Sequence, residues 1–449
     1  MNKIDSILEK LGIQLNAMQS AAFDTIANRR NNVVILSPTG SGKKYAYLFP
    51  LVKLLDENND QLQAVVITPG RELALQSATV LKDMGAGIRC LACYGGRPTM
   101  DEHRTIKQVM PQVVFGTPGR LNDHFSKGNL STYGIKFIII DEFDKCLEMG
   151  FLDEMQSLIG KLPEMARRIL LSATDSEEIS HFVEKTISGK KQKIEKLDFR
   201  QEDEQVSSRV KIYKVKSPEK DKLETLAQLL LVLGDESSIV FLNHRDSVER
   251  TADFLKDRGF SLSYFHGGME QKRREDALYS FSNGSANIFV STDLASRGLD
   301  IPNIDNIIHY HLPESEDGYI HRVGRTARWE NKGKAYFILG PQESIPEYVD
   351  ADVEDYAGMS DADFNDLKPA QPKMATIYIG KGKKDKISKG DIVGYLCKKG
   401  GLKSDEIGKI DVKDRYAYAA VKRVKLRQVL RQVQGEKIKG IKTVVEEVR

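Results

Sequence analysis

The sequence predicts an α/β protein with two tandem domains built on parallel sheets, followed by a small α+β domain. Three observations support this prediction. Short apolar segments alternate with longer amphipathic stretches in two successive series, a pattern typical of parallel strands joined by helices. From Lys373 onward the order changes to strand, helix, strand, strand, helix, strand (β-α-β-β-α-β). The chain has 449 residues, enough for about three domains at roughly 150 residues each.

The first series of expected strands lies between about residues 31 and 175. Its segments are rich in β-branched residues and are too short to be helices. They are NVVIL (32–36), AVVIT (64–68), IRCLACY (88–94), QVVFG (112–116), KFIIID (136–141) and RILLSAT (168–174). Cys90 and Cys93 lie in the third segment. We interpret them as buried strand thiols, because no second Cys or His pair follows nearby to complete a metal site.

The second series repeats this organisation. Its expected strands are VKIYKVK (210–216), SSIVFLN (237–243), LSYFH (262–266), ANIFVST (286–292), IDNIIHYH (304–311) and KAYFILG (334–340). The segment between Pro341 and Pro372 holds nine acidic residues and one lysine, with prolines that break regular structure, and is predicted to be a connector. The expected domains are therefore 1–205, 206–345 and 373–449, with an acidic linker at 346–372.

The third domain is strongly basic. Between Lys373 and Arg449, 21 lysines and arginines stand against 9 acidic residues, a net charge of +12. The whole chain carries +3, so the preceding residues carry −9. This charge favours binding to a polyanion, although a well-solvated surface would have the same composition. The expected elements are ATIYIG (375–380), DIVGYLCKKGGL (391–402), IGKIDV (407–412), RYAYAAV (415–421), VLRQVQGEKI (429–438) and TVVEEVR (443–449).

Composition excludes several classes of protein. Apolar residues make up 40% and charged residues 29% of the chain, which is ordinary for a globular protein and unlike a collagen or a disordered chain. The longest apolar stretches, such as residues 137–140, are far below the roughly 18 residues of a membrane span. The N-terminal segment MNKIDSILEKLG has no continuous apolar core, so no secretory signal is predicted. With four scattered cysteines, we expect a cytoplasmic protein that does not contact a membrane.

A phosphate-binding loop is predicted at Ser37–Lys44, with the sequence SPTGSGKK, between an expected strand and an expected helix. Its glycines would let backbone N–H groups close around phosphates, and Lys43 would add a positive charge. Farther along, Asp141 and Glu142 end an apolar strand, where carboxylates can hold hydrated Mg²⁺ and position a water. The two segments together predict a site for a nucleoside triphosphate.

An ordered series of segments resembles the DEAD-box RNA helicases over nearly the whole chain. Any one of these short motifs could arise by chance, but this many in one order could not. The resemblance implies two RecA-like P-loop domains that hydrolyse ATP, with Mg²⁺, to separate RNA strands locally. The segments are LGIQLNAMQ (11–19), PGREL (69–73), GG (95–96), TPGR (117–120), DEFD (141–144), SAT (172–174), HGGMEQKRRE (266–275), TDLASRGLD (292–300) and HRVGRTAR (321–328).

The resemblance also assigns roles around the nucleotide. Asp141 would hold Mg²⁺ through water, and Glu142 would orient the attacking water. Arg325 and Arg328 would neutralise charge in the transition state, and Lys43 would hold phosphates. The residues expected to bind the nucleotide are Gln19, as the reader of adenine, with Ser37, Pro38, Thr39, Gly40, Ser41, Gly42, Lys43, Lys44 and, at the ribose, Asp300.

For RNA, the resemblance implies a groove that grips the phosphodiester backbone without reading its sequence. Ser172 and Thr174 would couple this groove to the nucleotide site. His321 would couple the second domain to the DEFD carboxylates. The expected RNA contacts in the core are Pro69, Arg71, Gly95, Gly96, Thr117, Arg120, Gln271, Arg274 and Thr292.

Lys44 departs from the family pattern, which has a threonine whose hydroxyl is a ligand of Mg²⁺. A lysine has three donors and no acceptor. If its side chain turns to solvent, a water could take the place of the ligand; if it points inward, it could displace Mg²⁺. We expect reduced but real ATPase activity. The alternatives are an RNA-binding chaperone or nucleotide switch with weak or no ATPase activity, and a helicase that acts on DNA.

The third domain resembles an RNA-recognition motif and, in more detail, the C-terminal domain of DbpA-type bacterial DEAD-box helicases. This implies docking on a hairpin of large-subunit ribosomal RNA, a role in assembly of that subunit, and pre-ribosomal particles as partners. Tyr378, Tyr416 and Tyr418 are candidates for stacking on bases, but the glycine pattern usual around such aromatics is missing. The expected phosphate contacts are Lys381, Lys383, Lys384, Lys386, Lys398 and Lys399.

Overall fold

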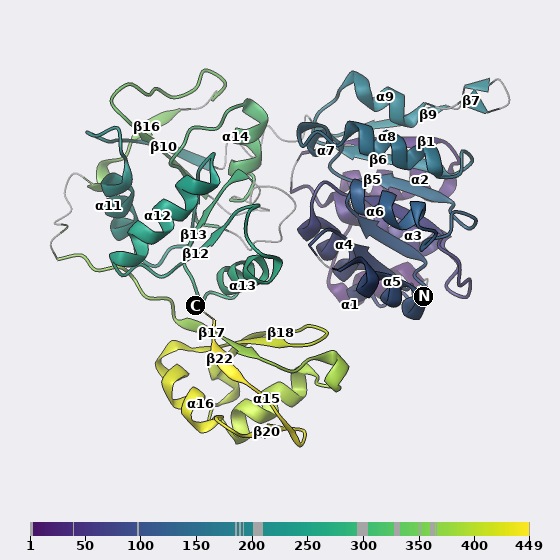
Figure 1. Ribbon diagram of the computed structural model, residues 1–449. Coiled ribbons are helices and arrows are strands. Elements are labelled where there is room, and N and C mark those ends of the chain that lie inside the picture. The colour runs from purple at the N-terminus through teal and green to yellow at the C-terminus, as the bar shows by residue number, and fades with distance from the viewer. Residues whose placement is uncertain are drawn as a thin grey trace. The chain divides into compact units, whose positions relative to one another are not determined.

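A computed structural model describes residues 3–38, 40–96, 98–184, 186–187, 190–191, 193–200, 210–293, 304–326, 333–349, 352–359, 364 and 366–448. These residues form two compact units, one up to residue 200 and the other from residue 210 onward. The first unit is one α/β domain. The second contains another α/β domain and the small C-terminal domain (Figure 1). None of the helices in these residues is long and apolar enough to span a membrane.

The first unit is built on a parallel sheet whose strand order, over the described residues, is β3-β4-β2-β5-β6-β1-β9. All six strands predicted from the sequence are present. They are largely buried because helices cover both faces of the sheet. Strand β9 was not predicted, since its sequence IEKLD has no apolar run, and it pairs with β1 at the sheet edge. The strands are β1 (Asn32–Leu36), β2 (Ala64–Ile67), β3 (Cys90–Cys93), β4 (Val113–Gly116), β5 (Phe137–Ile140), β6 (Arg167–Ser172) and β9 (Ile194–Asp198), with a short hairpin of β7 (Thr186–Ile187) and β8 (Lys190–Lys191).

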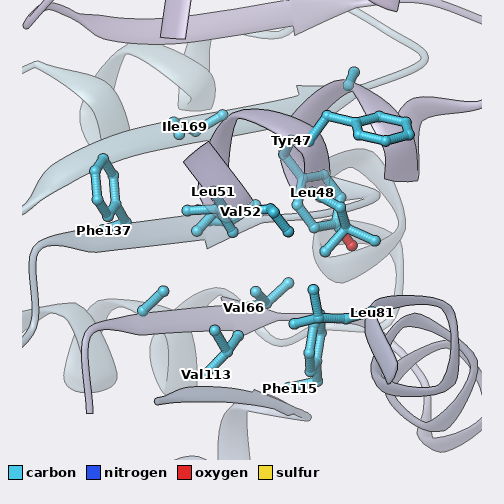
Figure 2. Close-up of a cluster of buried hydrophobic side chains, with 14 of the residues drawn as sticks. Tyr47, Leu48, Leu51, Val52, Val66, Leu81, Val113, Phe115, Phe137 and Ile169 are labelled. Carbon is cyan, nitrogen blue, oxygen red and sulfur yellow. The ribbon is translucent and has the colours of Figure 1, made fainter. Parts of the chain in front are cut away.

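Helices α1 to α4 pack on one face of this sheet and α5 to α9 on the other, each set with its own hydrophobic core. On the first face, Tyr47, Leu51 and Val52 of α3 pack over the strands in the same cluster as Val66 and Phe115 (Figure 2). The helix that follows the predicted phosphate-binding loop is therefore held by its own apolar residues. The helices are α1 (Lys3–Leu11), α2 (Ala17–Asn28), α3 (Lys43–Leu54), α4 (Arg71–Met84), α5 (Thr99–Val109), α6 (Pro118–Ser126), α7 (Phe143–Glu148), α8 (Leu152–Lys161) and α9 (Glu177–Val183).

The second unit begins with a parallel sheet of order β12-β13-β11-β14-β15-β10-β16 among the described residues. Its six predicted strands are present. Strand β16 lies in the segment expected as a linker: it pairs with β10, and the neighbouring Tyr356 packs its ring against Tyr213 and Tyr336. That segment therefore contributes an edge strand. The elements are β10 (Val210–Lys216), α11 (Leu223–Leu233), β11 (Ser238–Phe241), α12 (Arg245–Asp257), β12 (Leu262–Phe265), α13 (Gln271–Ser282), β13 (Ile288–Ser291), β14 (Asn306–His309), α14 (Glu316–Val323), β15 (Gly333–Leu339) and β16 (Val353–Asp355).

The C-terminal domain has the predicted β-α-β-β-α-β order, with an antiparallel sheet of order β18-β19-β17-β22 and one hydrophobic core beneath it. The second helix was expected to continue to residue 438, but it ends at Gln432. Gly435 has φ +76°, a left-handed conformation that a helix cannot continue through, and β20 begins two residues later. The elements are β17 (Met374–Ile379), α15 (Lys389–Lys398), β18 (Ile407–Val412), β19 (Ala417–Lys422), α16 (Leu426–Gln432), β20 (Lys437–Ile438), β21 (Ile441–Lys442) and β22 (Val445–Glu447).

Candidate nucleotide site and RNA-facing residues

The predicted phosphate-binding loop connects buried β1 to the first turn of α3. Gly42 precedes the helix with φ +82°, a conformation that favours glycine, and a side chain there would collide with the carboxamide of Gln19. The Nζ atom of Lys43 donates to the backbone oxygens of Ser37, at 2.5 Å, and Pro38, at 2.8 Å. The loop thus folds around the lysine that would meet a phosphate. Thr39 lies outside the described residues.

Gln19 links its own segment to this loop. Its side-chain oxygen accepts from the Asn16 N–H at 3.0 Å, and its side-chain nitrogen donates to the Gly42 oxygen at 3.1 Å. Asn16 caps helix α2 and also donates to the backbone oxygen of Ser41 at 3.0 Å. In this structure the buried Gln19 amide contacts the loop backbone, so its predicted contact with adenine would use its remaining N–H or the second lone pair of its oxygen.

Asp141 and Glu142 follow β5, as predicted. Asp141 is buried, and Tyr47 of α3 donates its hydroxyl to Oδ2 of this carboxylate at 3.2 Å. Burial raises the pKa of Asp141, and the positive charges of Lys44 and then Lys43 oppose this rise. Glu142 has φ +52°, an uncommon conformation for a residue with a side chain. Tyr47 was not predicted as a site residue, because its position in the sequence is that of an ordinary core aromatic.

Lys44 turns toward α4, where its ammonium hydrogen-bonds to the side-chain oxygen of Gln76. A protein-bound Mg²⁺ takes oxygen ligands. Lys44 offers only N–H donors, and one oxygen of Asp141 already accepts the Tyr47 hydroxyl. Position 44 therefore supplies no oxygen ligand for Mg²⁺, and the contact of Asp141 with Mg²⁺ through water stays a prediction.

The DEFD and SAT segments meet at the ends of β5 and β6. Oδ2 of Asp144 accepts from the Ala173 N–H at 3.2 Å, and the Ser172 backbone oxygen accepts from the Ser37 N–H at 3.0 Å. The SAT segment therefore touches both the phosphate-binding loop and the carboxylate segment. Asp144 was not predicted as a site residue. Thr174, which was, is half-buried beside this junction.

Arg71 begins α4 and reaches the Gly95–Gly96 turn. Gly96 has φ +90°, and a Cβ there would lie 2.6 Å from Nη1 of Arg71. Two segments predicted to face RNA thus come together, 69–73 and 95–96, and Pro69 is buried just before this helix. Because the guanidinium lies directly on the turn, the absence of a side chain at position 96 is what admits it.

Arg120 is held by a buried polar network. Its Nε donates to the Tyr94 oxygen at 3.2 Å and lies 3.2 Å from Oε2 of Glu102 in an ion pair, and Nη1 donates to Thr99 at 2.5 Å. Glu102 also lies 2.8 Å from Nε2 of the fully buried His124. These contacts fix the start of α6, whose N-cap is the predicted Thr117. No sequence pattern indicated Glu102 or His124.

In the second unit, Arg322 of α14 is the centre of a buried hydrogen-bond network, although it was not predicted as a site residue. It is fully buried and pairs with Asp293, with Nη2 at 3.0 Å from Oδ2. It also donates to the His311 oxygen at 2.7 Å and the Asn243 oxygen at 2.8 Å. Thr292, predicted to contact RNA, precedes Asp293. The predicted His321, Arg325 and Arg274 are also buried, whereas Asp300 and Arg328 lie outside the described residues.

Helix α13 carries the predicted Gln271 and Arg274 and also packs on the C-terminal domain. The rings of Tyr279 and Tyr418 stack with centroids 4.7 Å apart. Tyr418 donates to Asp276 and Tyr416 donates to Glu275. Burial raises the pKa of the Asp276 carboxyl.

The face of the C-terminal sheet that α13 covers is the face expected to stack on bases. Alternation along β17 and β19 sends Ile377 and Ala419 into the domain core and leaves Tyr378 and Tyr418 on the opposite face. Lys272 of α13 lies over the Tyr378 ring, 4.6 Å from its centroid. The tyrosines thus serve as contacts within the chain in this structure. The lysines predicted to bind phosphate are Lys381, half-buried, and Lys383, Lys384, Lys386, Lys398 and Lys399, all exposed.

Comparison with known families gives three matches in chain order. They are "DEAD/DEAH box helicase" at residues 16–182, "Helicase conserved C-terminal domain" at residues 221–330 and "DbpA RNA binding domain" at residues 376–447. The three matched ranges correspond to the two parallel-sheet domains and the small antiparallel one.

Curated relatives match almost the whole chain. ATP-dependent RNA helicase DbpA of Escherichia coli (strain K12) is 33% identical over 445 residues, which cover 96% of this chain and 94% of the relative. ATP-dependent RNA helicase DbpA of Bacillus subtilis (strain 168) is 30% identical over 462 residues, covering 96% and 95%. Among solved structures, S. cerevisiae Dbp5 bound to RNA and ADP BeF3 has a TM-score of 0.69 at 24% identity, covering 79% of this chain and 93% of that one. The last likeness supports the fold.

Proposed function

The chain belongs to the DEAD-box family of ATP-dependent RNA helicases, and we propose that it works in assembly of the large ribosomal subunit by docking on a ribosomal RNA hairpin. As a family member it is an RNA-stimulated ATPase. The proposed docking on ribosomal RNA is supported by the match to a DbpA RNA-binding domain and by the net charge of +12 from Lys373 to Arg449. Its partners would be pre-ribosomal particles in the cytoplasm, a compartment that suits its four free cysteines.

At the nucleotide, Lys43 and the loop N–H groups would hold phosphates and Glu142 would orient the attacking water. Arg325 would neutralise charge in the transition state. Lys43 would first exchange its bonds to the Ser37 and Pro38 oxygens for a phosphate. Mg²⁺ enters this proposal as the counter-ion of ATP, with no ligand from position 44.

For the hairpin, the exposed lysines are better candidates than the tyrosines. Lys383, Lys384 and Lys386 are exposed after β17, whereas Tyr418 is fully buried against α13. A phosphate backbone needs accessible cations, and base stacking needs an accessible ring. We therefore propose recognition through the lysine-rich loop, with the sheet face reserved for the contact within the chain.

One second function is favoured by a specific observation. The ammonium of Lys44 at the position of a metal ligand supports an RNA-binding nucleotide switch with little turnover. Steady-state ATP hydrolysis by the full chain distinguishes the ribosomal helicase from the nucleotide switch. Hydrolysis is measured without nucleic acid, with unrelated RNA, with matched single-stranded DNA and with a large-subunit ribosomal RNA fragment that carries the hairpin. Stimulation by the fragment alone supports the ribosomal helicase. Tight fragment binding without hydrolysis supports the switch.

A further inference from the structure

The nucleotide site contains a positive charge where the family places a metal ligand. Lys44 and Tyr47 lie three residues apart on α3 and so share one face of the helix. The Tyr47 hydroxyl is 3.2 Å from Oδ2 of Asp141, so this face lies next to the buried carboxylate. A buried carboxylate is stable only with hydrogen bonds or a compensating charge. The helix supplies both from its own side chains.

The ammonium of Lys44 is fixed rather than free in solvent. Its hydrogen bond to Gln76 joins the first turn of α3 to the second turn of α4, and both side chains are half-buried. Of the positive charges that act on the pKa of Asp141, that of Lys44 has the largest effect and that of Lys43 comes second. Because Lys44 lies three residues before Tyr47, on the helix face that meets Asp141, its ammonium is on the side of α3 that faces the buried carboxylate.

A divalent cation in the same place would meet this ammonium. Two like charges beside the same buried carboxylate repel each other. Conversely, nucleotide phosphates that reach the loop would meet two adjacent ammonium groups, Lys43 and Lys44. The protein itself therefore brings positive charge that related sites obtain from a metal.

Resting on the nucleotide-binding function above, we propose that the Lys44 ammonium and the Tyr47 hydroxyl replace the divalent cation at Asp141, so that ADP and ATP bind with nearly the same affinity with and without Mg²⁺. The site would then be a nucleotide site with a built-in monovalent cation. The residue at position 44 then determines whether nucleotide binding depends on Mg²⁺.

Titration of the full chain with a fluorescent ADP analogue measures this directly, in Mg²⁺ and in excess EDTA. For the wild type we expect the two dissociation constants to agree within about threefold. For Lys44→Thr, whose hydroxyl is an acceptor, we expect binding in EDTA to weaken at least tenfold relative to Mg²⁺. Lys53→Thr is the matched control, because this exposed lysine lies on the same helix away from the loop.

The possible outcomes separate this proposal from the proposed function. Wild-type binding that weakens tenfold or more in EDTA, to the same degree in Lys44→Thr, overturns the replacement of the cation and leaves the helicase assignment intact. Absence of binding in both conditions overturns both. Tyr47→Phe provides a second variant: we expect it to shift the EDTA-to-Mg²⁺ ratio in the same direction as Lys44→Thr but by less, because the ammonium remains.

Discussion

Oδ2 of Asp144 accepts a hydrogen bond from the Ala173 N–H at 3.2 Å, which joins the DEFD segment to the SAT segment. Its other oxygen accepts from the Lys145 N–H at 3.0 Å. Both hydrogen bonds are shielded from water, because Asp144 is buried. The segment beside the predicted nucleotide carboxylates is thereby tied to the segment expected to transmit RNA binding.

Asp144→Ala removes the acceptor of this link. A buried N–H without a partner costs about 1–3 kcal/mol, so we expect a lower free energy of unfolding and a roughly tenfold loss of RNA-stimulated ATP hydrolysis. Asp144→Asn keeps one acceptor oxygen and should retain most of the activity. Equal stimulation in wild type and Asp144→Ala would show that the link does not couple the two segments.

Lys44→Thr should raise turnover. It removes the positive charge beside Asp141 and restores a hydroxyl acceptor where the family has one. We expect kcat for RNA-stimulated ATP hydrolysis in Mg²⁺ to increase about tenfold. Steady-state kinetics on both proteins provide the test, and comparable or faster turnover by the wild type would contradict it.

Gln19→Ala should weaken nucleotide binding even if Gln19 never touches the base. The side chain bonds to Asn16 and to the Gly42 oxygen, so its loss frees the loop that begins α3. Two hydrogen bonds at about 1 kcal/mol each correspond to roughly a 10- to 30-fold rise in Kd for ADP. Gln19→Glu keeps the acceptor for Asn16 but loses the donor to Gly42, and an intermediate Kd is expected. An unchanged Kd in Gln19→Ala would refute this account.

Tyr418→Ala should loosen the C-terminal domain from α13. The fully buried ring stacks on Tyr279 and its hydroxyl bonds to Asp276, and truncation of a buried aromatic costs about 3–5 kcal/mol. We expect a lower melting temperature and faster proteolysis near residues 366–373. Tyr418→Phe, which keeps the ring, should lose only about 1 kcal/mol. If Tyr418→Phe abolished binding of the RNA hairpin without changing stability, the tyrosine would be an RNA contact after all.

Acid should destabilise the second unit through His311. Burial first, then the nearby charges of Lys222, His244 and Arg322, lowers the pKa of this histidine from 6.5 to about 4, so the folded chain stays unprotonated where the unfolded chain takes a proton. Stability present above pH 6.5 is therefore lost progressively down to about pH 4. With allowance for partial solvent screening, the loss should be about 1–2 kcal/mol.

Denaturant unfolding at pH 7.5 and pH 5 measures this effect. The His311→Asn variant is the control, because its side-chain oxygen can still accept from the Asn243 N–H and does not titrate. The buried His309, whose pKa is also lowered by burial, titrates equally in both proteins. The same pH dependence in both would assign the effect to other groups.

Elements whose evidence is local could be predicted from the amino-acid sequence. Gly42 and Lys43 could be recognised because a strand, a glycine turn and a helix follow one another within a few residues, and the twelve core strands because an apolar run reports burial directly. Polar edge strands such as β9 gave no such signal. Their pairing depends on a strand distant in the chain.

Which side chains meet depends on the folding of distant segments onto one another. Tyr47 reaches Asp141 across 94 positions of sequence, Lys44 reaches Gln76 across 32, and Tyr418 reaches Asp276 across 142. Periodicity shows that each is buried or amphipathic but not against what, because the partner is fixed by strand order and by the docking of whole elements. For this reason the predicted base-stacking face is a contact within the chain, and the sequence could not tell which way Lys44 turned.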